Sequence, residues 1–275
     1  AILAAKQSRR YILQADIDQA FVKVGIGAEK KSKVISEKEK KITAYHETGH
    51  AILFHELPDV GPVHTISIIP TGMGAAGYTM PLPEKDEMFN TKNKMLETIM
   101  VSLGGRIAEE IIFGDVTTGA SQDIKQATQI ARAMVTQYGM SEKFGLMGLA
   151  TQENQYLTGR TVLNCGDATA AEIDVEVMRM LKGAYAEAKR LLSENRDALD
   201  KIADFLIEKE TITGKEFMKI FRQVKGIPEP EEEIRPEKKR MGGAPVDPAA
   251  MERPETPRES SGAAPETDSR TQVPS

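Results

Sequence analysis

The chain has 275 residues, of which 40% are hydrophobic, and this is enough to build a substantial core. Aromatic residues make up only 5%, tryptophan is absent and the net charge is −5, which argues against nucleic acid as a partner. The one cysteine, Cys165, cannot form an intrachain disulfide, so an ordinary thiol in a reducing compartment is expected.

The N-terminal region predicts a helical piece of a larger protein. Residues 1–24 alternate apolar and polar side chains at helical spacing, and Asp16 is placed to cap a second short helix. The chain starts without methionine, and no run of 18 apolar residues or signal-peptide pattern is present. We therefore expect a soluble fragment, with a linker at Gly25, Gly27 and the lysines that follow.

The next elements are a long helix and a pair of strands. Ser36 and Glu39 predict a capping box, and the helix should end near Leu57 because Pro58 cannot continue it. HTISIIP then alternates like a strand, and GYTMPLP predicts a partner strand whose prolines confine it to a sheet edge.

The rest of the ordered chain reads as helices, so the predicted fold is mainly α with a small β-hairpin or edge strand. The expected helices are 91–113 ending at Gly114, one capped by Ser121 and ending at Gly139, 167–193, 196–209, and one after a second capping box at Thr213 and Glu216. Residues 226–275 hold most of the 14 prolines and predict a disordered tail rich in Pro and Glu.

The motif HETGH carries the clearest chemical signal. His46 and His50 are four residues apart on a predicted helix, so both imidazoles project from one face, as two bonds to one zinc ion require. Glu47 lies about 100° round the helix, where it can act as general base on a water molecule beside the metal. The interior Gly49 costs about 1 kcal/mol relative to alanine, which implies a packing or functional reason. His55 and His64 are interpreted as structural.

A catalytic zinc needs a third protein ligand. Glu109 lies inside a helix, where it can ligate or can pair with a cation such as Arg106. Asp123 lies in the first turn of its helix, where the helix dipole already favours a carboxylate. Residue chemistry alone makes Glu109 and Asp123 nearly equal candidates for the third zinc ligand.

The sequence does not support nucleotide binding by either of two common motifs. GMGAAG at residues 72–77 matches a dinucleotide-binding fingerprint, but it leads into YTMPLP instead of the required helix. No GxxxxGK[ST] loop is present, so the chain by itself is not expected to hydrolyse ATP.

Four blocks in order, VISEKEKKITAYHETGHAIL, ISIIPTGMGAAGYTMPLP, SLGGRIAEEIIFG and TTGASQDIKQATQIARAMVTQYGMS, resemble the peptidase domain of the FtsH family of membrane-anchored, ATP-dependent zinc proteases. The resemblance implies that His46, His50 and Asp123 are the zinc ligands and Glu47 the catalytic base. It gives Glu109 a supporting or structural role.

The same resemblance implies a domain layout. Residues 1–27 would be the last helices of an AAA+ ATPase lid, 28–225 the zinc peptidase domain and 226–275 the disordered tail. ATP-binding motifs and transmembrane helices would lie upstream, and the parent protein would be a homo-hexamer on the cytoplasmic face of the cell membrane. The expected activity is zinc-dependent cleavage of unfolded or misfolded cytosolic and membrane proteins. The alternatives are a hexameric scaffold ring with a non-catalytic metal and a zinc hydrolase for small molecules.

Overall fold

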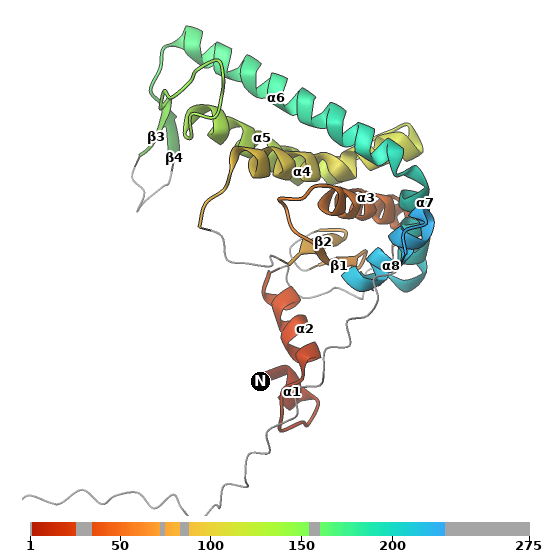
Figure 1. Ribbon diagram of the computed structural model, residues 1–275. Helices are drawn as coiled ribbons and strands as arrows, with labels where there is room; N and C mark the ends of the chain where they lie inside the picture. Colours follow the sequence, from red (N-terminus) through yellow and green to blue (C-terminus); the bar gives the residue numbers. More distant parts are fainter. Residues whose placement is uncertain (1, 26–34, 72–74, 83–87, 154–159, 229–275) are drawn as a thin grey trace, which may run out of the picture. The chain divides into compact units, whose positions relative to one another are not determined.

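The computed structural model describes residues 2–25, 35–71, 75–82, 88–153 and 160–228, and within them the fold is mainly helical, as predicted (Figure 1). The elements, in chain order, are α1 (Ile2–Lys6), α2 (Gln14–Gly25), α3 (Glu37–Glu56), β1 (Val63–Ser67), β2 (Tyr78–Pro81), α4 (Lys92–Phe113), the 3-10 turn η1 (Thr118–Ala120), α5 (Ser121–Thr136), β3 (Ala150–Glu153), β4 (Arg160–Leu163), α6 (Asp167–Glu194), α7 (Arg196–Lys209), β5 (Thr211–Thr213) and α8 (Gly214–Lys225). None of the helices in the described ranges is both long and apolar enough to cross a membrane.

The first two helices form as expected, although Asp16 acts from inside α2 and not from the position before it. Its carboxylate accepts a hydrogen bond of 2.8 Å from the backbone N–H of Leu13 and two more from the guanidinium of Arg9. These bonds lower the pKa of Asp16 to about 2, with the Arg9 bond the largest cause. Gly25, predicted to belong to the linker, is instead the last residue of α2, and the rest of the predicted linker lies outside the described residues.

Helix α3 begins with the predicted capping box. Ser36 Oγ accepts from the N–H of Glu39 at 3.2 Å, and Glu39 Oε2 accepts from the N–H of Ser36 at 3.3 Å. The helix ends at Glu56 with Leu57 as its C-cap. Helix α4 ends at Gly114, whose φ of 64° suits glycine because it has no Cβ.

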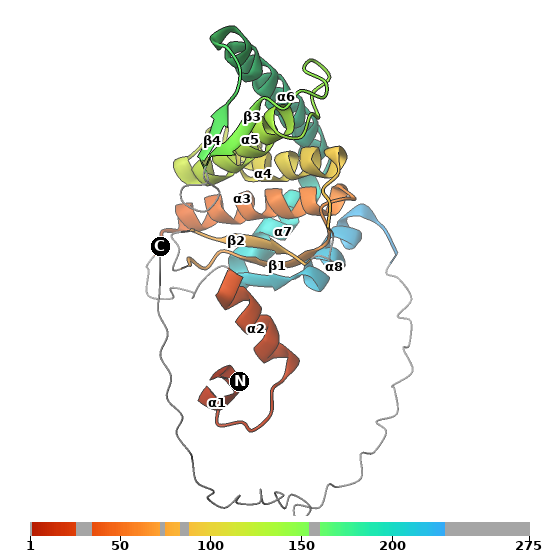
Figure 2. The same cartoon turned by 90° about the vertical axis from the view of Figure 1, so that its left-hand side faces the viewer.

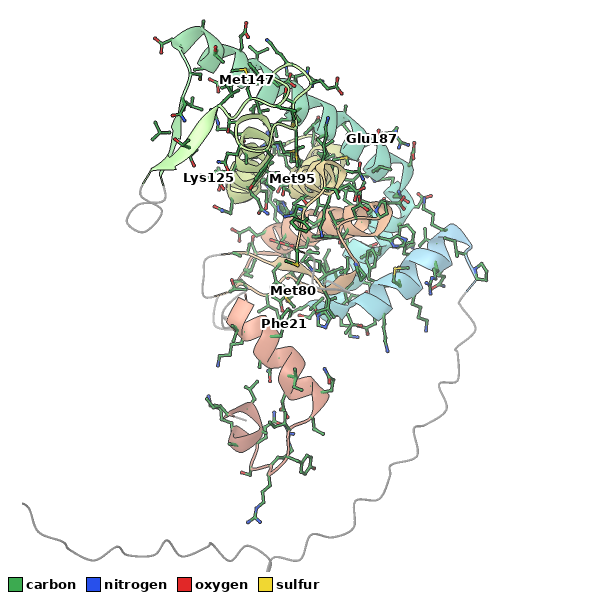
Figure 3. All side chains as sticks on the ribbon, turned by 60° about the vertical axis from the view of Figure 1, so that its left-hand side comes forward. Phe21, Met80, Met95, Lys125, Met147 and Glu187 are labelled. Carbon is green, nitrogen blue, oxygen red and sulfur yellow. The ribbon has the colours of Figure 1, made fainter. Side chains whose placement is uncertain are left out.

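The strands β2, β1 and β5 form one antiparallel sheet in that order, and the sheet packs against α3 (Figure 2). β2 is therefore an edge strand, as its prolines predicted. Register pairs Ile66 with Thr79 on one side and with Ile212 on the other. Met80 of β2 is buried in this layer (Figure 3). The sequence interpretation missed β5, and its statements about residues 72–74 and Pro83 fall outside the described residues.

The start of α5 corrects one prediction. Ser121 is the first residue of the helix and does not cap it; Ala120 occupies the cap position, with no side-chain hydrogen bond. The turn η1 comes first, and Thr117 Oγ1 caps it by accepting from the N–H of Gly119 at 3.1 Å. The helix ends at Thr136, and Gly139 follows with a φ of 61°.

The remaining helices match their predicted bounds within a residue, and α8 carries the predicted capping box from Thr213 to Glu216. The hairpin of β3 and β4 was not predicted. A single apolar cluster joins α3 to α8, and its largest fully buried members are Ile52, Leu53, Ile66, Ile99, Ile107, Met134, Leu149, Ile173, Leu192, Leu199, Ile202 and Phe217. The predicted tail lies outside the described residues from 229 onward.

Candidate metal centre

Three side chains from two helices converge at one point. His46 and His50 lie one turn apart on α3, and their Nε2 atoms are 3.1 Å apart. Asp123, from the first turn of α5, places Oδ2 3.3 Å from His46 Nε2 and 3.9 Å from His50 Nε2. One ligand atom from each residue lies within 4.8 Å of the others, which is the spacing that one metal ion can bridge.

The Nδ1 atom of each imidazole, on the side of the ring away from the proposed metal position, lies within hydrogen-bond distance of an acceptor oxygen. His50 Nδ1 lies 2.7 Å from the backbone carbonyl oxygen of Val101, and His46 Nδ1 lies 2.7 Å from Glu109 Oε1. A carbonyl oxygen can only accept, and a carboxylate does the same, so both Nδ1 atoms carry a proton. In the neutral rings, both Nε2 lone pairs therefore face each other and the Asp123 carboxylate. Such a group of acceptors fits a cation placed between them.

The electrostatics agree that this point attracts positive charge. Burial lowers the pKa of His50 to about 4, so its ring is neutral at neutral pH. Burial also acts to lower the pKa of His46, but hydrogen bonds to Asp123 and Glu109 outweigh it and raise that pKa to about 10. Without a metal, His46 therefore carries a second proton, on Nε2, in the position that a metal ion would replace.

Glu47 lies beside the triad on α3 and is buried, with 7% of its surface exposed. Burial raises its pKa to about 7, against the opposing effects of His46 and a hydrogen bond from Thr79. A carboxyl group with a pKa near neutrality is suited to accept and return a proton. The structure thus brings all four predicted site residues, His46, Glu47, His50 and Asp123, into one region.

Glycines allow the helices to approach this closely. A Cβ on Gly49 would lie 2.6 Å from the carbonyl oxygen of Gly104, and a Cβ on Gly105 would lie 2.4 Å from the ring of His46. The expected reason for an interior glycine at position 49 is therefore close packing of α3 on α4. Gly105, in turn, leaves room for the imidazole ring of His46.

Glu109 does not pair with Arg106, one of the alternatives open from the sequence. Its Oε1 accepts from His46, and its Oε2 accepts from the backbone N–H of Thr117 at 2.7 Å. Glu109 is 1% exposed, and these bonds hold its pKa below the usual value although burial opposes them. The carboxylate thus orients a histidine and fixes the turn before α5, the helix that carries Asp123.

The other histidines lie elsewhere, as expected. His55 packs edge-on against Phe221, with ring centroids 4.4 Å apart, and His64 Nδ1 lies 2.8 Å from Thr65 Oγ1. Sequence reasoning missed the contributions of Val101 and Thr79. A backbone carbonyl has no residue-type signature, and the threonine reaches Glu47 only through the packing of the sheet.

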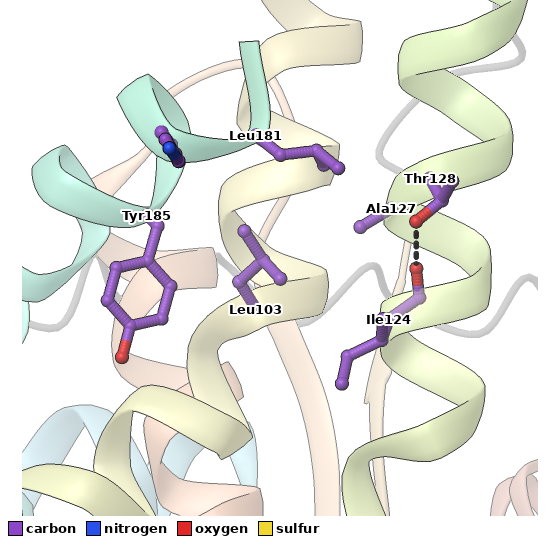
Figure 4. Close-up of a pocket in the computed structure, with 7 residues that line it drawn as sticks. Leu103, Ile124, Ala127, Thr128, Leu181 and Tyr185 are labelled. Carbon is purple, nitrogen blue, oxygen red and sulfur yellow. Dashed lines mark hydrogen bonds between the residues drawn. The ribbon is translucent and has the colours of Figure 1, made fainter. Parts of the chain in front are cut away.

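An apolar groove of about 190 Å³ lies between α4, α5 and α6 (Figure 4). It is lined by Leu103, Ile124, Ala127, Thr128, Leu181, Lys182 and Tyr185. None of the four candidate site residues lines this groove. Its lining is mostly apolar, so the triad, and not this groove, remains the candidate reactive centre.

An HExxH helix with a carboxylate from a second helix beside its two histidines defines a zinc metalloendopeptidase. Comparison with known proteins agrees with this class. Residues 33–220 match the model of Peptidase family M41. The chain belongs to Peptidase family M41, whose relatives bear out the resemblance described above and imply Zn²⁺ as the cofactor.

Several curated relatives are named ATP-dependent zinc metalloprotease FtsH. The protein from Clostridium perfringens is 49% identical over 220 residues, which covers 80% of this chain and 31% of that protein. The protein from Caldicellulosiruptor bescii is 48% identical over 223 residues, covering 80% and 36%. The protein from Thermotoga maritima is 44% identical over 226 residues, covering 81% and 37%. The chain thus spans about a third of the length of these relatives.

Proposed function

We propose that this chain contains the zinc-dependent endopeptidase domain of an ATP-dependent, membrane-anchored protease that degrades unfolded or misfolded cytosolic and membrane proteins. The observation that carries the proposal is the convergence of two imidazole lone pairs and a carboxylate beside a buried glutamate. The names of the relatives support the ATP dependence, which would come from a module upstream of this chain.

The proposed layout keeps residues 1–27 as the end of an AAA+ lid, 28–225 as the peptidase domain and 226–275 as a disordered tail. The parent protein would be a homo-hexamer anchored by upstream segments, with its peptidase on the cytoplasmic face of the membrane. Unfolded polypeptides would be the substrates. The similarity covers only about a third of each of these longer proteins, which supports this layout.

In the proposed mechanism, His46, His50 and Asp123 hold the zinc ion, which supplies Lewis-acid polarisation of the substrate carbonyl and a lowered pKa for water when bound. Glu47 takes the proton from the attacking water and returns it to the leaving amine. In the metal-free chain, burial raises the pKa of Glu47 to about 7, which supports its proposed role as the group that binds and releases this proton.

The edge strand β2 would bind the substrate backbone by strand addition. Main-chain hydrogen bonds carry most of such binding, which makes it tolerant of side-chain sequence, as degradation of unfolded chains requires. The strand lies directly against Glu47, because Thr79 Oγ1 bonds to it at 2.8 Å. The bound peptide bond would thus pass close to the base.

The test is cleavage of casein by the full 275-residue chain, with and without a chelator, and with Glu47→Gln. Cleavage should stop with chelator, return with zinc, and fall at least about 100-fold in the variant. Undiminished cleavage by Glu47→Gln would remove Glu47 as the base while leaving the metal in place. No cleavage by the zinc-loaded wild type would contradict the proposal for this chain.

The scaffold alternative is less well supported. A structural zinc site is closed by four protein ligands, whereas a catalytic site keeps one position open. Within the described residues, the group that can hold a metal contains three ligands. A fourth protein ligand, found by X-ray absorption spectroscopy of the zinc-loaded chain, would favour the scaffold instead.

A further inference from the structure

Thr79 contacts the candidate base from the edge strand. Its hydroxyl Oγ1 lies 2.8 Å from Glu47 Oε2 and 2.9 Å from the backbone carbonyl oxygen of the same residue. A backbone carbonyl oxygen can only accept, so the threonine hydroxyl is the donor, and its single proton is shared between the two oxygens. One hydroxyl therefore ties β2 to α3 and holds one oxygen of the Glu47 carboxylate.

The neighbouring Gly77 brings the strand close enough for this bond. Gly77 is the residue before β2, and a Cβ at this position would face Glu47, as the Thr79 side chain does. A Cβ on Gly77 would lie 3.0 Å from Glu47 Cγ, 2.6 Å from the carbonyl oxygen of Ser67 and 2.8 Å from Thr43 Cγ2. The glutamate stem therefore packs on the bare backbone at Gly77 while its carboxylate meets the hydroxyl at Thr79.

We infer that Thr79 is a positioning residue, whose hydroxyl fixes the rotamer of Glu47 so that the second carboxylate oxygen is aimed at the reacting water. The inference rests on the proposed role of Glu47 as the base. A free glutamate side chain samples several rotamers, whereas the bond to Thr79 and the contact with Gly77 select one. Misplacement of a catalytic group by about 1 Å can reduce a rate about 100-fold.

This arrangement separates the contributions of Thr79 to binding and to chemistry. Strand addition uses the backbone of β2, which a change of the Thr79 side chain leaves in place. Placement of the proton acceptor, in contrast, matters only in the chemical step. Loss of the hydroxyl should therefore lower kcat and leave KM nearly unchanged.

The kinetic test compares Thr79→Val, which removes the hydroxyl at nearly constant volume, with Thr79→Ser, which keeps it. Valine should lower kcat for a fluorogenic peptide about 10- to 100-fold with equal zinc content, and serine should restore most of it. Thr65→Val is the matched control, because Thr65 is a buried threonine on β1 whose hydroxyl contacts His64. A rise in KM with unchanged kcat, or equal loss in valine and serine, would overturn the inference.

A second measurement does not depend on activity. Urea unfolding of the wild type, Thr79→Val, Glu47→Ala and the double variant forms a double-mutant cycle for the full chain. The hydrogen bond predicts non-additive effects, with a coupling of about tenfold in the unfolding equilibrium constant. Additive effects would overturn the Thr79 inference even where casein is cleaved. Coupling in a chain that cleaves nothing would instead contradict only the proposed function.

Discussion

Glu109 Oε1 accepts a hydrogen bond from His46 Nδ1 at 2.7 Å, on the side of the ring that faces away from His50. The bond fixes the tautomer in which the Nε2 lone pair is free to bind a metal. The other carboxylate oxygen accepts from the N–H of Thr117, which belongs to the turn that leads to Asp123. One buried side chain thus supports two of the three proposed ligands.

Glu109→Gln should weaken zinc binding about 10- to 100-fold without removing it. An amide can still meet His46, but it carries no charge to stabilise the metal-bound imidazole. Competition with a chromophoric chelator measures the change. Glu110→Gln is the control, because Glu110 is the adjacent residue and pairs with Lys189 on the protein surface. Equal effects of the two changes would contradict a specific role for Glu109.

Asp123→Ala should release zinc more completely than Glu109→Ala. Asp123 would lose a direct bond to the metal, whereas Glu109 acts through His46. Metal content after gel filtration, measured by atomic emission, distinguishes the two roles. If only Glu109→Ala releases zinc, the third ligand is Glu109 and the proposed ligand set is wrong.

Local signals in the sequence predicted most of the helical framework. The capping boxes at Ser36 and Thr213 and the left-handed glycine at Gly114 are encoded within a few residues, and each one forms. The strand β5 has only three residues, and it exists because Ile212 pairs with Ile66 far away in the chain. No local pattern encodes such a pairing. Ser121 fails as a cap for a different reason, because the short turn η1, capped by Thr117, directly precedes α5.

In the candidate site, too, local spacing predicted some features, whereas others depend on tertiary packing. Helical spacing alone placed His46 and His50 on one face and Glu47 beside them. The choice between Glu109 and Asp123 depends on how α4 and α5 pack against α3, which spacing does not encode. The structure brings Asp123 to the Nε2 side and Glu109 to the Nδ1 side of His46. These positions support the two proposed tasks, metal binding by Asp123 and orientation of His46 by Glu109.

Gly49→Ala should destabilise the fold, although alanine is the better helix former. Its Cβ would lie 2.6 Å from the carbonyl oxygen of Gly104 and 2.7 Å from Ala108 Cβ, so α3 and α4 must separate. We expect a loss of about 1 to 3 kcal/mol in the free energy of urea unfolding. Gly183→Ala on α6 is the control, because its Cβ meets nothing within 4 Å. That change should instead stabilise by up to about 1 kcal/mol.

Glu176 on α6 predicts a dependence of stability on pH that is independent of the metal. The carboxylate accepts from Arg179 Nε at 2.8 Å and from Ser141 Oγ at 2.9 Å, and it is 4% exposed. The hydrogen bond from Arg179 is the largest cause of a pKa lowered from 4.5 to about 2. Because the folded state binds the proton less readily than the unfolded state, the stabilisation is complete above about pH 4.5 and disappears as the pH falls towards 2.

Glu176→Gln should therefore lower the free energy of unfolding by about 1 to 2 kcal/mol at pH 7, since Arg179 is partly exposed to solvent and screened. The difference from the wild type should shrink steadily between pH 4.5 and pH 3. Protonation of the metal site also destabilises the chain at low pH, but it affects both proteins equally and cancels in the difference. Glu187→Gln, which breaks an exposed pair with Arg190, should change stability little at any pH. A Glu176→Gln difference that stays constant with pH would mean that packing, and not charge, accounts for the contribution of Glu176.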